Sequence, residues 1–344
     1  MIFTKWGKYM NKFFLVLLTI LALFLSACSQ KVTIKALHPA EIHRVSSTKM
    51  ISIAPFKNDR VNLSGKIETK LAQHRLDGEK YFTIISRKDF NKIIKEQKIQ
   101  NSGLIDQNTA VEVGNLIGAQ AIVSGDVGRV SSSDTKYYEN RFRCADKKCK
   151  ETVIYRVRCT KRTVGLTADM RIVDVVRGDI IYADTMRRNQ VYRHCSDDSN
   201  PLPSKDMVAQ KLAISIADSF TYKLLPHYKH FEVVLLEEAD LDYTDKQEEL
   251  LEFSLKYIEQ ARYDKAQQLL FQLIDSTAQQ SYVPFYNLGV LKEVEGNYEE
   301  AKEYYEMADR LMVKPVEEIS KAYNRIKSLI KKREQAYMQI KRGQ

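Results

Sequence analysis

The sequence predicts an α/β domain with a mixed sheet and flanking helices, followed by an all-α, tetratricopeptide-like helical repeat domain. Three observations support this fold class. Short β-branched runs, MISIAPF at 50–56 and FTIIS at 82–86, are typical of buried strands. Segments with apolar residues at helical spacing follow them, and such alternation is typical of an α/β unit. From about residue 245 the pattern is helical throughout, and one motif recurs.

The chain starts with a short apolar run, Phe13 to Leu25, which ends in FLSACSQ at 24–30. Three lysines without an acidic residue precede the run: Lys5, Lys8 and Lys12. A transmembrane helix needs about 20 apolar residues, so this shorter run favours a cleaved export signal over residues 1–27. Translation from Met10 instead of Met1 would leave a more ordinary signal, and the sequence does not decide between the two starts.

Leu25-Ser26-Ala27-Cys28 resembles the bacterial lipobox, in which the cysteine is acylated and becomes the first mature residue. The resemblance implies lipidation of Cys28, and Ser29 after it favours the periplasmic face of the outer membrane over retention at the inner one. The alternative is an uncleaved anchor with a chance cysteine. Residues 28–48 are polar without clean periodicity, so we expect a lipidated N-terminus and tether there.

Two helices and a strand are expected next. Ser86 and Asp89 indicate a helix start, followed by Phe90, Ile93 and Ile94 at helical spacing. A second helix is expected from Thr109, with Glu112 in its first turn and Gly118 at its end. Its inner stripe is Val113, Leu116 and Ile117. AQAIVSGDV at 119–127 then indicates a strand.

The segment FTIISRKDFNKIIKEQKIQNSGLIDQNTAVEVGNLIGAQAIVSGDV resembles the curli-secretion lipoprotein family, CsgG, which is similar in fold to the penicillin-binding-protein activator LpoB. The matching residues are Arg87, Glu96, Gln97, Ser102, Gly103, Gly114, Gly118, Ala119 and Gly125. The likeness is dense from 50 to 130 and weaker from 205 to 236. It implies a CsgG/LpoB-like domain over 49–238, with a cysteine-containing hairpin insertion over 129–195.

The C-terminal part, 239–344, indicates helical repeats. ARYDKAQQLL at 261 recurs as GNYEEAKEYY at 296, and the tyrosines are 35 residues apart, against the 34-residue tetratricopeptide period. The residues expected to pack the repeats are Leu288, Gly289, Tyr298, Ala301, Tyr305 and Ala308. A last helix over 316–340 would cap the stack, and so short a solenoid usually needs a neighbour.

The positive charge of the chain lies in the insertion. The net charge is +10, and residues 1–27 contribute three lysines and no acid, which leaves +7 for the mature chain. Residues 129–162 hold eleven Lys or Arg against four Asp or Glu, so they account for that excess. We expect a patch there for an anionic lipid, a glycan or an acidic protein. Its residues are Arg141, Arg143, Lys147, Lys148, Lys150, Arg156, Arg158, Lys161 and Arg162.

Four cysteines lie in the same insertion: Cys144, Cys149, Cys159 and Cys195. Cysteines of an exported chain normally pair, and four allow three connectivities, among which sequence alone does not choose. We favour Cys144–Cys149, closing a hairpin tip, and Cys159–Cys195, joining the strand through 153–176 to its neighbour, 179–193. A zinc site that uses His194 is the alternative, although the spacings match no common metal pattern.

The sequence carries no recognised catalytic motif. None of the six histidines lies in HExxH, and neither GxSxG nor a phosphate-binding glycine loop occurs. We therefore expect no catalytic residue, no cofactor and no resident metal. Nucleic acid is not expected either, because a periplasmic location and the lack of an aromatic stacking platform argue against it.

A secretion pore is the rival hypothesis, because the CsgG family extends strands to build one. Lipid-facing strands need alternate apolar residues over about 9–11 positions. In ETVIYRVRCTKRT one face carries Arg156, Arg158 and Arg162, and the other carries Lys161. This pattern argues against lipid-facing strands, although a water-lining face can be polar.

The resulting hypothesis is a non-enzymatic, outer-membrane-anchored periplasmic scaffold or regulator of an envelope machine for secretion, motility or wall synthesis. The helical repeats would bind an envelope protein partner. Two alternatives stay open: a subunit of an oligomeric secretion channel, which requires a homo-oligomer, and an activator of a peptidoglycan synthase, which needs only one copy.

Overall fold

The computed structural model describes residues 29–85 and 107–341. Within them the chain forms two compact units. The helical unit contains the chain up to Leu37 and Tyr228–Glu334, and the sheet unit contains His38–His227 and the end from Gln335. The predicted signal over 1–27, the lipidation site Cys28 and the helix expected after Ser86 lie outside the described residues.

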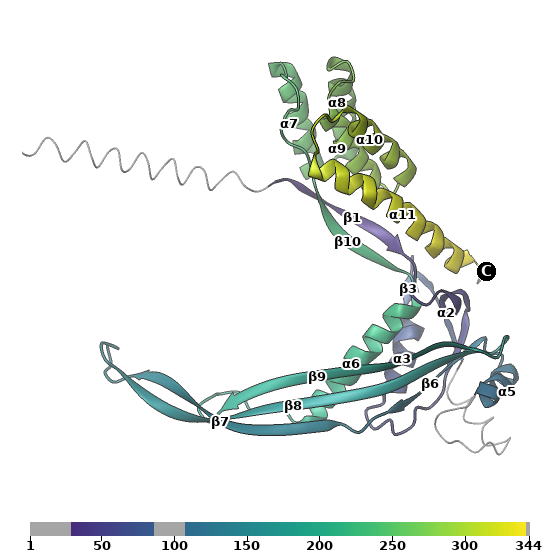
Figure 1. The fold of residues 1–344 in the computed structure, drawn as a ribbon, viewed down its shortest axis with the longest axis vertical. Helices are drawn as coiled ribbons and strands as arrows, with labels where there is room; N and C mark the ends of the chain where they lie inside the picture. The colour runs from purple at the N-terminus through teal and green to yellow at the C-terminus, as the bar shows by residue number, and fades with distance from the viewer. Residues whose placement is uncertain (1–28, 86–106, 342–344) are drawn as a thin grey trace, which may run out of the picture. The chain divides into compact units, whose positions relative to one another are not determined.

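The sheet unit is built on a mixed sheet, as predicted, and this sheet has six strands (Figure 1). Its strands are β2 (Met50–Ile53), β5 (Thr83–Ile85), β6 (Ala121–Val127), β7 (Ser131–Cys144), β8 (Thr152–Asp174) and β9 (Ile180–Cys195). The order is β5-β2-β6-β8-β7, with β9 paired to the other edge of β8. The β2 pairs are parallel, and every pair of β8 is antiparallel. A separate antiparallel pair is formed by β3 (Arg75–Leu76) and β4 (Glu79–Lys80).

Helices cover the part of this sheet that lies away from the tip of β7 and β8 (Figure 1). They are α2 (His43–Ser47), α3 (Leu63–Gln73), α5 (Gln107–Ile117) and α6 (Lys205–Leu224). The longest, α6, lies along β8 and β9 and packs against α3. It buries Val208, Leu212, Ile216, Phe220 and Leu224 at helical spacing, so one stripe of α6 forms much of the core.

The helix expected from Thr109 is α5, which starts at Gln107. Ala110 and Val113 are buried and cluster with Ile122 and Val173 of the sheet, whereas Leu116 of the predicted inner stripe is 51% exposed, which corrects that part of the prediction. The predicted stop is observed, because Gly118 follows the helix with φ +71, a left-handed conformation that costs glycine little.

The helical unit consists of two helix pairs and a long final helix. Their bounds are α7 (Asp245–Glu259), α8 (Tyr263–Ser276), α9 (Tyr282–Val294), α10 (Tyr298–Leu311) and α11 (Glu317–Lys341). Successive helices contact each other from α7 to α10, as expected for stacked repeats. The last turns of α11 belong to the sheet unit, where Gln339 exchanges hydrogen bonds with the main chain of Ala40.

The segment predicted to be a tether contains a strand instead. β1 (Lys31–His38) pairs with β10 (His227–Val234) in a separate two-stranded sheet. Val32, Ile34 and Ala36 are buried while the residues between them are exposed, so the segment alternates as a half-buried strand does. The flanking polar residues hid this short alternation in the sequence.

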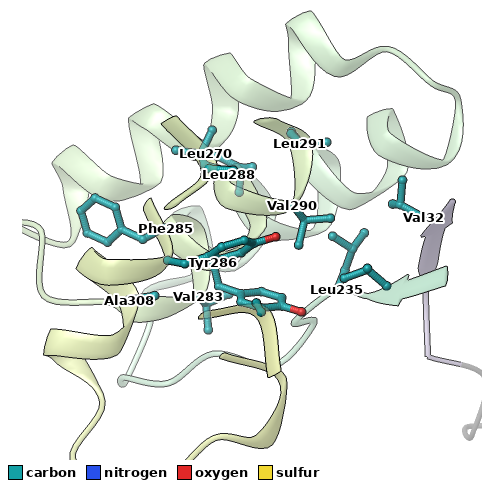
Figure 2. Close-up of a cluster of buried hydrophobic side chains, with 14 of the residues drawn as sticks. Val32, Leu235, Leu270, Val283, Phe285, Tyr286, Leu288, Val290, Leu291 and Ala308 are labelled. Atoms are coloured by element: carbon teal, nitrogen blue, oxygen red, sulfur yellow. The ribbon is translucent and has the colours of Figure 1, made fainter. Parts of the chain in front are cut away.

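β10 also corrects the predicted domain bounds, since residues 227–234 were expected to belong to the CsgG/LpoB-like domain over 49–238. Val32 of β1 and Leu235, just after β10, point toward Tyr286 and Val290 of α9 (Figure 2). All four residues belong to the core of the helical unit. Because apolar residues on the β1–β10 ribbon are buried against helices, the ribbon is part of the repeat unit and the expected boundary at 238 falls about ten residues too late.

Candidate interaction surface

The insertion over 129–195 is formed by the long strands β7, β8 and β9. The β7–β8 register is continuous from Ser131↔Gly165 to Cys144↔Thr152, and β9 pairs with β8 as far as Cys159↔Cys195. Because facing residues of an antiparallel pair lie on the same face, the register divides the side chains between two faces. Residues 136–160 form the distal part of the β7–β8 hairpin.

One face of the distal hairpin, here called the covered face, has a small core of its own. Its members are Tyr137, Tyr155, Val157, Cys159 and Cys195, of which the last three are buried. A disulfide joins Cys159 to Cys195, and this is one of the two pairs favoured from the sequence. The bond links β8 to β9 beyond the part of the sheet that the helices cover.

A short acidic segment after β9 closes over the covered face. Arg141 donates to the carboxylates of Asp197 at 2.7 Å and Asp198 at 3.0 Å. Tyr155 donates its hydroxyl to Asp197 at 2.6 Å, and the Cys195 N–H donates to Asp198 at 2.6 Å. The Tyr155 hydroxyl lowers the pKa of Asp197, and the Cys195 N–H followed by Arg141 lowers that of Asp198. Both acids are therefore held ionised across three strands.

The second disulfide, Cys144–Cys149, closes the hairpin tip. Within the tip, the Lys150 N–H donates to the Asp146 carboxylate at 2.8 Å, and Cys149 takes a left-handed backbone with φ 53. Lys147, Lys148 and Lys150 are all exposed. In the described part of the chain no ion pair involves these three lysines. They are exposed cations of the insertion that could contact an anionic partner.

The nine basic residues do not form one patch, which corrects the sequence-based expectation. The period of two places Arg141, Arg143 and Lys161 on the covered face, and Arg156, Arg158 and Arg162 on the other, here called the open face. Several of them have partners inside the fold. Arg141 binds Asp197 and Asp198, and Arg162 binds Asp134 and the carbonyl of Pro203.

Two further arginines of the nine lie over aromatic rings. The Arg156 guanidinium is 4.3 Å from the ring centroid of Tyr138, and that of Arg143 is 5.6 Å from Tyr155. Charge counting along the sequence could not reveal these partners, because they lie on neighbouring strands.

The open face carries exposed apolar side chains that sequence reasoning missed. Phe142 is 68% exposed, its cross-strand partner Ile154 is 64% exposed, and Tyr138 on the same face is 57% exposed. Arg156 and Arg158 lie beside them on β8. The sequence does contain a signal for this cluster: Tyr138 and Phe142 are four residues apart, so they lie on the same face of a strand. We define the open-face cluster as Tyr138, Phe142, Ile154, Arg156 and Arg158.

The helical unit places its predicted packing residues as expected. Leu288, Tyr298, Ala301, Tyr305 and Ala308 are buried. A Cβ at Gly289 would lie 2.6 Å from the Tyr305 ring, so the glycine permits close approach of α9 and α10. Glu293, fully buried, accepts hydrogen bonds from Tyr305 and from Arg325 of α11. This ion pair ties α11 to the repeats.

Asn287 of α9 has a binding role that its sequence context did not indicate. Its carboxamide binds the main chain of Leu236, and the Tyr286 hydroxyl donates to the Val234 carbonyl at 2.7 Å. Asp240, further along, accepts from the Tyr282 N–H at 2.7 Å. One face of α9 therefore holds the extended segment 234–240 of the same chain.

The described residues contain one group that could in principle ligate a metal: Glu139, Cys159 and Cys195. Both sulfurs form the disulfide, so neither is available as a thiolate ligand. All four cysteines of the insertion are in disulfides, so none is a free thiolate for the alternative zinc site with His194. No helix within the described ranges is both long enough and apolar enough to cross a bilayer.

These features define the general class of the protein. It is built from an α/β sheet domain and helical repeats. Its two disulfides are typical of proteins of an oxidising compartment. Residues 26–194 match the family described as "Curli production assembly/transport component CsgG". Over these residues the chain is CsgG-like, as its motifs predicted.

Nineteen chains of solved structures match this protein. One is the lipoprotein GNA1162 from Neisseria meningitidis. The two chains are 12% identical in sequence, the match covers 50% of this chain and 98% of that chain, and the TM-score is 0.26. A search of curated proteins finds no match.

Proposed function

We propose that this chain is a non-enzymatic, lipid-anchored periplasmic scaffold or regulator at the outer membrane, where it takes part in assembling an envelope machine. The CsgG-like match supports the envelope role, since that family is described as an assembly and transport component. The lipobox at 25–28 supports the anchor. The machine would serve secretion, motility or wall synthesis.

The open-face cluster is the observation that carries the proposal. Three large apolar side chains, each more than half exposed, lie beside two arginines at the distal end of the β7–β8 hairpin. One disulfide closes the tip of this hairpin, and the other joins its strand β8 to β9. Exposed apolar groups rimmed by polar ones are typical of protein interaction sites, and aromatic and arginine side chains dominate binding energies there. An acidic protein surface with an apolar centre fits this cluster better than a purely anionic lipid or glycan.

The repeats supply a second surface for an envelope protein. Because one face of α9 holds residues 234–240, the partner would use the outward side of α8 and α10. Phe271 and Met307 are 43% and 39% exposed there, and the Phe271 ring lies 6.4 Å from that of Tyr304. The segment 245–312 holds fourteen acidic and seven basic residues, so a basic partner is favoured.

In-cell photo-crosslinking tests the proposal. A photoreactive amino acid replaces Phe142 in the open-face cluster, and the matched control replaces Ser131, an exposed residue at the other end of the same strand. We expect one envelope protein to crosslink at 142 and not at 131. Loss of that product in the K147Q/K148Q/K150Q variant would show that the tip lysines contribute. Absence of any product specific to 142 would contradict the proposal.

The secretion channel is the second candidate, favoured by the length of β7 and β8 and by the exposed apolar residues at their distal ends. Light scattering and negative-stain imaging of the detergent-extracted mature protein distinguish the two functions. Closed rings with a stained central hole would support the channel, whereas monomers or dimers would support the scaffold.

A further inference from the structure

The fold holds the chain in place almost directly after the lipobox cysteine. Gln30 is the second residue after Cys28. Its N–H donates to the Glu237 carboxylate, and its side-chain amide donates to the Leu255 carbonyl of α7 at 2.8 Å. Its own carbonyl accepts from the Leu235 N–H at 2.9 Å. Three hydrogen bonds therefore attach Gln30 to the helical unit.

The residues after Gln30 are also held in the fold. Lys31 begins β1 and pairs with Glu232 of β10 at 3.1 Å. Val32 and Ile34 are 6% and 0% exposed in the core of the helical unit. Residues 31–38 of the tether expected over 28–48 therefore form a strand whose apolar residues are part of this core.

Chain geometry then limits the distance between anchor and fold. A residue spans at most about 3.3–3.6 Å, so the two steps from Cys28 to Gln30 cover no more than about 7 Å. We infer that the helical unit lies directly on the bilayer, with the surface around Ser29 against the lipid headgroups. This inference rests on the proposed acylation of Cys28, and it names the part of the protein that meets the membrane.

The chemistry of that surface selects the kind of lipid. A shallow cavity of about 460 Å³ lies beside Ser29, and Glu237, Glu238, Tyr282 and Glu318 line it. Carboxylates repel anionic headgroups and attract ammonium groups, while tyrosine is enriched at membrane interfaces. The surface fits zwitterionic lipids of the phosphatidylethanolamine class, which carry an ammonium group.

A single tryptophan can report this contact. The chain has one tryptophan, Trp6, which lies in the signal, so the mature protein has none. Ala239, exposed and lining the same cavity, is replaced in the full mature chain (Ala239→Trp). The acylated protein is reconstituted in phosphatidylethanolamine and phosphatidylcholine vesicles that contain a lipid with a nitroxide on its headgroup. The matched control has twenty Gly and Ser residues inserted between Ser29 and Gln30, a spacer of about 25 Å root-mean-square length.

We expect the nitroxide to quench the native-length protein at least threefold more strongly than the protein with the spacer. Weak quenching of the native-length protein would overturn the inference. Equally strong quenching of both proteins would show that the short connection between Cys28 and Gln30 is not what holds the helical unit at the bilayer. The intact mass is measured first: protein without acyl chains would contradict the lipid anchor, and hence the proposed function, independently of where the helical unit lies.

Discussion

Asn287 holds the main chain of Leu236 by two hydrogen bonds in opposite directions. Its carboxamide oxygen accepts from the Leu236 N–H at 3.0 Å, and its amide nitrogen donates to the Leu236 carbonyl at 2.8 Å. Asn287 is fully buried, and Leu236 lies two residues after Val234, the last residue of β10. One side chain thus fastens the ribbon to the helical repeats.

The first prediction concerns this pair. Asn287→Ala leaves two main-chain groups of Leu236 without their partner, so we expect a loss of about 1–3 kcal/mol in the free energy of unfolding. Urea unfolding measures the loss, and hydrogen exchange of the Leu236 N–H should accelerate. Asn297→Ala is the control, because Asn297 precedes α10 without a side-chain capping bond. Equal losses in the two variants would contradict the assigned role.

The second prediction concerns the glycine between α9 and α10. Gly289→Ala places a Cβ 2.6 Å from the ring of Tyr305, which is fully buried, so the ring or the helix must shift. Overpacking should cost about 1–3 kcal/mol, although alanine by itself favours a helix. Thermal unfolding checks this. Combining the change with Tyr305→Leu supplies room, so the added cost of Gly289→Ala should shrink in that background; an undiminished cost would point to another cause.

The third prediction is a pH dependence set by Lys49. Burial lowers the pKa of Lys49 from 10.5 to about 8, and its ammonium lies 3.5 Å from the ring centroid of Tyr81. Between pH 8 and 10 the unfolded chain keeps a proton that the folded chain has lost, so stability rises with pH there. Burial raises the pKa of Tyr81 to about 12, and its opposing effect starts only above the tyrosine's usual value of 10.

Lys49→Met should remove this rise, and the difference between the two proteins cancels the other titrating groups. Since Lys49 is only half-buried, the slope should be a part of the ~1.4 kcal/mol per pH unit that one full proton gives. Urea titrations at pH 7, 8, 9 and 10 measure it. Parallel curves for the two proteins over this range would show that Lys49 does not titrate there.

The fourth prediction separates the two disulfides. Cys159–Cys195 spans 36 residues and joins two strands, whereas Cys144–Cys149 spans 5 and closes a turn. By the chain-entropy estimate the longer loop is worth about 4 kcal/mol and the shorter about 2. We expect C159A/C195A to accelerate proteolysis throughout the distal hairpin, and C144A/C149A to affect the tip alone. Similar cleavage patterns would argue that the strand pairing, not the long-range bond, holds the hairpin.

Much of the fold could be predicted from local patterns. The strands at 50–53, 83–85 and 121–127 and the helix stop at Gly118 depend on neighbouring residues, and the sequence shows those directly. The repeat packing was predictable because Gly289 and Tyr305 occupy fixed places in a recurring motif. The candidate site was less accessible: its nine basic residues were recognised, while their division between two faces depends on the β7–β8 register.

The sequence by itself determined the α/β and helical composition, the concentration of charge in 129–162 and the residues that form the disulfides. Only the tertiary structure decided that residues 31–38 pair with 227–234, that Arg141 binds Asp197 and Asp198, and that Phe142 is left exposed. The physical reason is separation along the chain. Period and composition act over a few residues, whereas these contacts join segments from tens to about two hundred residues apart. Only packing selects such partners.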